Sequence, residues 1–184
     1  MTTATQQAIS TWSIDPVHSI VEFAVKHMMV STVKGRFRTV DGGVLHIDEA
    51  VPSRSSVSAT IDVASVDTGV EQRDAHLRSD DFFNAERFPK LTFRSTKIEQ
   101  DGDAWKMTGD LTIRDVTRSV VLDVAFEGRG VDAYGNERAG FTADTKISRK
   151  EFGVNWNGLI EAGGVVVGDT VRISLNIAAV RQDA

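Results

Sequence analysis

The groups best suited to chemistry gather in one stretch of the chain, residues 65–96. Arg73, Asp74 and His76 fall within one helical turn there, and together with Asp80 they resemble a set for general acid and base catalysis. Such catalysis needs groups that converge on one substrate atom, whereas these positions on a helix point in different directions. We therefore predict that Arg73 and Asp74 tie this segment to the rest of the fold through ion pairs.

The histidines do not have the spacing of a metal site. The four of them are His18, His27, His46 and His76. None forms an H-x-H or H-x-x-x-H pair, and the chain has no cysteine, so we predict no metal ion and no cofactor. His27 falls on the apolar face of a predicted strand, where it either binds a ligand head group or is satisfied within the fold.

Two other polar positions are expected to hold the fold together. His18 lies beside Asp15 and Ser19, a cluster that can pin the first strand to a neighbouring loop. Arg149 follows the end of a predicted strand, and we expect it to pair with an acidic residue of the segment 65–96.

Length and composition describe one domain. A chain of 184 residues can bury a sizeable core, and a net charge of −5 with scattered basic residues argues against nucleic acid as a partner. The chain opens without signal-peptide features, contains no apolar run that could span a bilayer as a helix, and lacks cysteine, so we expect it in the cytoplasm. Residues 1–11 are predicted to form a flexible arm, and residues 12–184 a single domain.

Most of the domain alternates apolar and polar residues with the period of a half-buried strand. The predicted strands lie at residues 20–28, 34–47, 56–63, 91–96, 105–114, 120–126, 139–147 and 171–179. The second is expected to bend at Gly42 and Gly43, and Asp101-Gly102 is typical of a hairpin turn. Closure removes the unpaired edges of such a meander, so the predicted fold is all-β, an antiparallel eight-stranded β-barrel.

The segment 65–96 interrupts this alternation between the third and fourth predicted strands. It is expected to contain a short helix, capped by Asp67 or Thr68 and carrying Glu71 in its first turn. An aromatic cluster follows, made of Phe82, Phe83 and Phe88. We interpret the segment as a plug, lid or crossover.

The sequence resembles the YceI-like family. The run DTGVEQRDAHLRSDDFFNAERFPKLTFRST at residues 67–96 is similar to the family signature, and so are WSIDPVHSIVEFAVKH, GDLTIRDVTRSVVLDV and ISRKEFGVN. Arg118-Ser119 departs from the pattern, because the family more often has a basic residue followed by proline there. The resemblance implies a lipocalin-like barrel of a kind that in some members holds a polyisoprenoid lipid.

The inward-facing rows mix aromatic residues with alanine, glycine and serine, which suits a long apolar cavity. The alternative is that large and small side chains interdigitate to native density. With the family resemblance we favour the cavity. The predicted ligand-binding residues are Val21, Phe23, Val25, His27, Phe37, Ala59, Ile61, Phe83, Phe93, Trp105, Met107, Leu111, Leu122, Phe126 and Phe141.

The sequence thus predicts a protein that binds, stores or transports an isoprenoid or a similar long-chain amphiphile, and not an enzyme. One alternative is a hydrolase or isomerase acting on such a ligand, with His27 or His76 as base. Another is a barrel that binds no ligand and serves as a scaffold. Charged residues on the presumed outer face argue against a transmembrane barrel, whereas Val121 and Ala125 on that face allow a homodimer.

Overall fold

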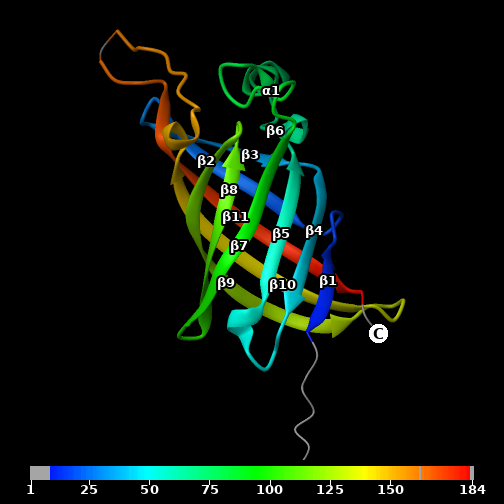
Figure 1. Ribbon diagram of the computed structural model, residues 1–184. Helices are drawn as coiled ribbons and strands as arrows, with labels where there is room; N and C mark the ends of the chain where they lie inside the picture. The colour runs from blue at the N-terminus through cyan, green and yellow to red at the C-terminus, as the bar shows by residue number, and fades with distance from the viewer. Residues whose placement is uncertain (1–8, 162, 183–184) are drawn as a thin grey trace, which may run out of the picture.

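In the part of the chain that the structure describes, the strands and a single α-helix follow each other with mostly short connections (Figure 1). The computed structural model describes residues 9–161 and 163–182. The strands are β1 (Ser10–Ile14), β2 (Ile20–His27), β3 (Ser31–Phe37), β4 (Val40–Ile47), β5 (Ser56–Asp62), β6 (Val66–Asp67), β7 (Lys90–Asp101), β8 (Ala104–Ile113), β9 (Val116–Val131), β10 (Glu137–Ser148) and β11 (Val167–Arg181). The helices are α1 (Glu71–Arg78) and the 3₁₀ turns η1 (Pro52–Arg54), η2 (Val63–Ser65) and η3 (Arg149–Phe152).

The sheet closes on itself as a barrel. Neighbouring strands run β1-β4-β5-β7-β8-β9-β10-β11, and β1 pairs with β11 to complete the ring. β11 pairs with β1 at its C-terminal end and with β2 over the rest of its length. β2 therefore continues the place of β1 in the ring, and β3, which pairs with β2, continues that of β4. All pairings are antiparallel. The predicted eight-stranded antiparallel barrel is therefore confirmed, with the short helix inserted between β6 and β7.

Local sequence explains several of the turns. Asp101-Gly102 makes the predicted hairpin between β7 and β8, and Gly102 has a φ of +62°, which glycine adopts at little cost. The predicted strand 34–47 is instead two strands, β3 and β4, separated at Arg38 and Thr39. Close to the predicted bend at Gly42 and Gly43, the register of β4 against β5 shifts between Val40 and Gly42, as at a bulge.

Two boundaries predicted from sequence need correction. β1 begins at Ser10, so it takes up the last two residues of the predicted arm, whereas residues 1–8 lie outside the described residues. The residue before helix α1 is Val70, which makes no side-chain cap. Asp67 instead accepts a hydrogen bond from the Gly69 amide, and Thr68 donates to Asp74.

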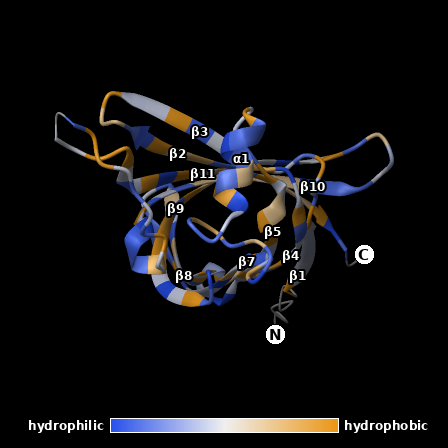
Figure 2. Cartoon of the chain, turned by 90° about the horizontal axis from the view of Figure 1, so that it is seen from above, coloured by the Kyte–Doolittle hydropathy of each residue, from blue (hydrophilic) through white to orange (hydrophobic). Residues whose placement is uncertain are grey.

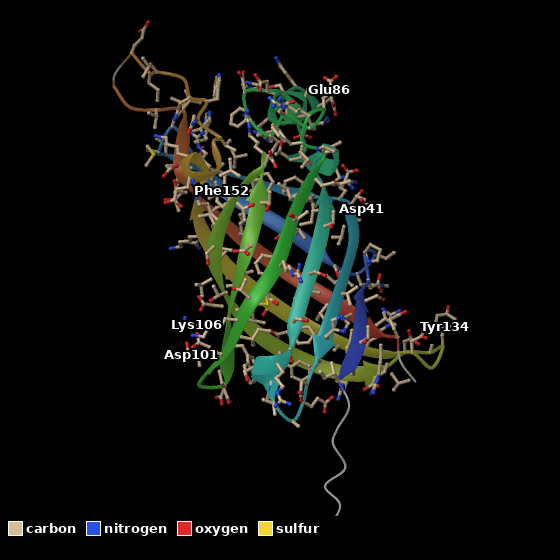
Figure 3. The ribbon with its side chains drawn as sticks, viewed as in Figure 1. Asp41, Glu86, Asp101, Lys106, Tyr134 and Phe152 are labelled. Atoms are coloured by element: carbon tan, nitrogen blue, oxygen red, sulfur yellow. The ribbon has the colours of Figure 1, made fainter. Side chains whose placement is uncertain are left out.

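The most deeply buried side chains lie toward both ends of the barrel. Trp12 is 0% exposed where β1 closes the ring, and its indole nitrogen donates to Ser10 Oγ at 2.8 Å. Phe152 and Val63 are similarly buried near α1, the end at which Figure 3 labels Phe152. We call this end of the barrel the α1 end.

Candidate ligand-binding cavity

The barrel encloses an apolar cavity of about 780 Å³. Every one of the fifteen predicted ligand-binding residues lines it: Val21, Phe23, Val25, His27, Phe37, Ala59, Ile61, Phe83, Phe93, Trp105, Met107, Leu111, Leu122, Phe126 and Phe141. Figure 2 looks along the barrel and shows its strands arranged in a ring. The alternation of apolar and polar residues thus located the lining, although occupancy by a ligand remains a prediction.

The centre of the barrel is hollow rather than packed. Phe23, Phe93 and Leu111 face inward, yet each stays only partly buried. In a filled core at native density such side chains would lose almost all their accessible surface. The alternative of a fully interdigitated interior therefore does not hold for this protein.

Two glycines let aromatic rings lie close to the barrel wall. A Cβ atom on Gly35 would sit 2.4 Å from the ring of Phe23, and one on Gly109 would sit 2.3 Å from the ring of Phe93. Each ring therefore occupies the space that a larger residue on the adjacent strand would take. Their small size suggested that the glycines leave empty space in the lumen. They instead make room for the aromatic rings that line it.

An aromatic cluster closes the α1 end, where the helical insert covers the barrel (Figure 2). Phe83 contacts Phe37 edge-on with ring centres 5.6 Å apart, and Phe82 packs against Trp156 at 5.3 Å. Phe88, which we expected in the same cluster, instead lies beneath the guanidinium of Arg87. Trp156 was missed from sequence, because it follows η3 in a segment without strand alternation.

Arg149 holds that segment in place and does not pair with the insert as predicted. The side chain is buried, and its guanidinium donates to the carbonyl oxygens of Gly168 and Val154 at 2.8 Å, Trp156 at 2.9 Å and Val167 at 3.2 Å. Burial lowers the pKa of this guanidinium from its ordinary value. The planar fork of donors thus fastens the loop before β11 to the end of β10.

The polar residues of the insert do not converge on one point. Arg73 donates from Nε to Thr68 Oγ1 at 2.7 Å and from a terminal nitrogen to the Thr68 carbonyl at 3.0 Å. His76 pairs with Asp81 at 2.8 Å, whereas Asp80 interacts with Arg114. The predicted ion pairs of Arg73 and Asp74 with the barrel are therefore wrong, because both bond to Thr68 within the insert.

The ends of the cavity differ in charge. Near α1 the polar side chains of the lining include His27, Arg73, His76 and the enclosed Arg149. At the opposite end it includes His46, Asp48, Glu49 and Arg129, of which Arg129 and Glu49 pair at 2.6 Å. Phe126 also lines the cavity but is 53% exposed.

The predicted cluster around His18 is present, away from the cavity lining. His18 Nδ1 lies 2.8 Å from Asp15, which also receives a hydrogen bond from Arg138 of β10 at 2.6 Å. Ser19 accepts from the Ala178 amide at 3.1 Å. Although desolvation raises the pKa of Asp15, hydrogen bonds from His18, Arg138 and two backbone amides outweigh it and hold that pKa well below its usual range. The cluster pins the turn before β2 to β10 and β11.

In the described part of the chain, no group of three His, Asp or Glu residues is arranged to hold a metal ion. None of the helices in the same residues is both long and apolar enough to cross a membrane.

A closed antiparallel barrel around an apolar cavity defines the class of lipocalin-like barrels. The family model of the YceI-like domain matches residues 12–179. The chain therefore belongs to the YceI-like family.

Its relatives agree with this assignment. Protein YceI of Escherichia coli O157:H7 is 42% identical over 137 residues, which cover 74% of this chain and 71% of that protein. The crystal structure of Campylobacter jejuni YceI has a TM-score of 0.72 at 34% identity, covering 86% of this chain and 90% of that one. Burkholderia cenocepacia BcnA has a TM-score of 0.78 at 26% identity, covering 90% and 98%. A polyisoprenoid-binding domain from Saccharophagus degradans shares the fold with a TM-score of 0.65 at 17% identity, covering 93% and 98%.

Proposed function

We propose that the protein binds, stores or transports an isoprenoid or a similar long-chain amphiphile in its barrel. The observation that carries the proposal is the apolar cavity of about 780 Å³ lined by inward-facing aromatic and aliphatic side chains. Burying each CH₂ group of a chain-like ligand is worth about 0.8 kcal/mol, so a few isoprene units give useful affinity. The description of the Saccharophagus degradans domain as polyisoprenoid-binding supports the same ligand class.

The polar residues argue for binding rather than catalysis. General acid and base groups must reach one reacting atom, and the polar groups of the insert form separate contacts instead. We therefore propose a carrier that performs no reaction on its ligand. A homodimer and a cytoplasmic location stay predictions.

We further propose that the ligand lies with its polar head at the α1 end. The lining there is cationic or neutral around Arg73 and His27, whereas the opposite end mixes acidic and basic groups. An anionic head such as a phosphate or carboxylate is favoured beside Arg73. Arg73→Gln should weaken binding of a polyprenyl phosphate more than binding of the matching polyprenol. Equal weakening of both would contradict this orientation.

The test of the proposed function combines extraction and titration. Organic extraction of the purified protein followed by mass spectrometry should yield a long-chain lipid. Titration with polyprenyl and fatty ligands should show saturable binding. Tryptophan fluorescence can report this binding, because Trp105 and Trp156 line the cavity whereas Trp12 does not. Trp12→Phe should keep the signal that Trp105→Phe reduces.

A matched pair of variants on β5 separates the lumen from the outer wall. Ala59→Phe places a ring inside the cavity and should lower affinity by at least about tenfold, the equivalent of losing two CH₂ contacts. Ser58→Phe adds the same ring on the exposed face and should leave affinity unchanged. No lipid in the extract and no saturable uptake would contradict the proposal. Loss of a measurable turnover in His27→Ala or His76→Ala would favour an enzyme.

A further inference from the structure

Four apolar side chains extend into solvent from two adjacent loops at the α1 end. Met28, Met29, Val30 and Leu159 are 43%, 63%, 84% and 92% exposed. The loops are joined where the Met28 amide donates to the Val166 carbonyl at 2.8 Å. Figures 1 and 2 both show the β2–β3 hairpin and the segment before β11 extending from the barrel on the same side. We call these four residues the apolar tip.

The turn itself does not favour methionine. Met28 and Met29 have φ values of +52° and +59°, and Val30 closes the turn by donating to the His27 carbonyl at 3.1 Å. Glycine and asparagine are preferred at such positions, and other residues cost about 1–2 kcal/mol each there. Exposed apolar residues held in a strained turn indicate that their side chains serve a purpose other than folding.

A row of cations lies on the outer wall beside the apolar tip. Lys34 of β3 pairs with Ala24 of β2, Ala24 with Arg172 of β11, and Arg172 with Lys146 of β10. The residues next to them, such as Ile173, line the cavity, so this row faces outward. Lys34, Arg172 and Lys146 are exposed, and no salt bridge involves them within the described residues. We call these three residues the cationic row.

The positive charge is local, because the whole chain carries −5. The neighbouring outward row, farther from the tip, mixes Arg36, Glu22 and Asp144. Lys26 adds another exposed cation next to the hairpin turn, and Glu161 is an exposed acidic residue on the loop of Leu159. Apolar side chains flanked by unpaired cations complement a bilayer that contains anionic lipids.

We propose that the apolar tip and the cationic row form a docking surface for a lipid bilayer containing anionic lipid. The tip enters the interfacial region, and the cationic row faces the head groups. The cavity lining reaches the base of the same hairpin through His27 and Val33, so docking brings the cavity next to the lipid. This biological role rests on the proposed carrier function, although docking itself can be measured without any cargo.

Flotation of the purified protein with vesicles tests the proposal. Vesicles of phosphatidylcholine with phosphatidylglycerol should carry the protein, and vesicles of phosphatidylcholine alone should carry much less. Met29→Ser with Val30→Ser should lower the partition coefficient about tenfold. Lys34→Gln with Arg172→Gln should lower it by about fivefold per cation, and raised salt should have a similar effect.

Matched control variants remove the same kinds of residue elsewhere. Val131→Ser with Tyr134→Ser removes exposed apolar side chains at the opposite end, where Figure 3 labels Tyr134. Arg94→Gln with Arg54→Gln removes two exposed cations away from the α1 end, because Arg54 lies on η1 at the opposite end of the barrel (Figure 1). Both controls should bind vesicles like the unchanged protein. Equal losses in tip and control variants, or no preference for phosphatidylglycerol, would overturn the proposal.

Two further results separate the explanations. If the Met29→Ser and Val30→Ser variant abolishes a dimer in size-exclusion chromatography without changing vesicle binding, the tip contacts a second copy and the proposal fails. Ligand titration in detergent-free buffer tests the cavity alone. Normal uptake without vesicle binding would reject docking only, whereas vesicle binding without uptake would reject the carrier function only.

Discussion

Replacing Arg149 by methionine should destabilise the fold by about 3–5 kcal/mol. The guanidinium donates to four backbone carbonyls, and that of Val167 also accepts from the Asn157 side-chain amide at 2.7 Å. The other three carbonyls lose this donor, at about 1–3 kcal/mol for each one left unsatisfied and buried. Methionine retains part of the apolar length, so the loss reports on hydrogen bonds more than on packing.

Equilibrium unfolding in urea, followed by circular dichroism, measures this change in free energy. Arg149→Lys should recover only part of the loss, because an ammonium cannot reproduce the planar fork. Lys150→Gln is the matched control, since Lys150 is the exposed neighbour, and it should change stability by less than about 0.5 kcal/mol. A loss below about 1 kcal/mol for Arg149→Met, with Asp169→Asn costing more, would refute the reasoning in favour of an ion pair.

The remaining predictions concern a glycine and a carboxylate. Gly109→Ala should lower the free energy of unfolding by about 2 kcal/mol in the same urea assay, because the added Cβ meets the Phe93 ring. Gly42→Ala is the control and should cost far less, because a Cβ at that position meets nothing within 4 Å. The Arg138 guanidinium, with three hydrogen bonds from Asn136 and Tyr134, holds the pKa of Asp132 well below its ordinary value. Because the folded-state pKa is lowered, this stabilisation is present above pH about 4 and is lost as pH falls below it. Between pH 7 and pH 3 the free energy of unfolding should fall by less in Asp132→Asn than in the unchanged protein. An equal fall in both would contradict the prediction.

The period of two predicted the strands of the barrel and the face of each residue, and the family resemblance favoured a cavity over a filled interior. Inward and outward residues such as Phe23 and Glu22 differ by one position, so the alternation assigns each to a face whatever the neighbouring strand is. That is why the predicted lining residues on the strands reach the cavity, Phe126 included although it is half exposed, whereas Phe83 reaches it from the insert, where no alternation exists. The break at Arg38 and Thr39 carries no glycine or proline and so left no signal.

Contacts between distant loops were not predictable in the same way. The acceptors of Arg149 are backbone carbonyls, which every residue carries, so its sequence neighbours could not distinguish this role from an ion pair. Trp156 joins the aromatic cluster only because η3 and the insert meet over one end of the barrel. Met28 and Met29 occupy a turn that normally selects glycine or asparagine, so no turn signal marked it.

The seam between β1 and β11 also dictates when the protein can finish folding. Trp12 pairs with Arg181 and Ile14 with Ala179. β1 therefore cannot form its pairing with β11 until β11, the last strand of the barrel, has been synthesised. During synthesis the nascent chain therefore keeps two open sheet edges, and contacts of such high sequence separation form slowly. Loss of the final residues of β11 would leave that seam unsealed and the chain prone to aggregate through its edges.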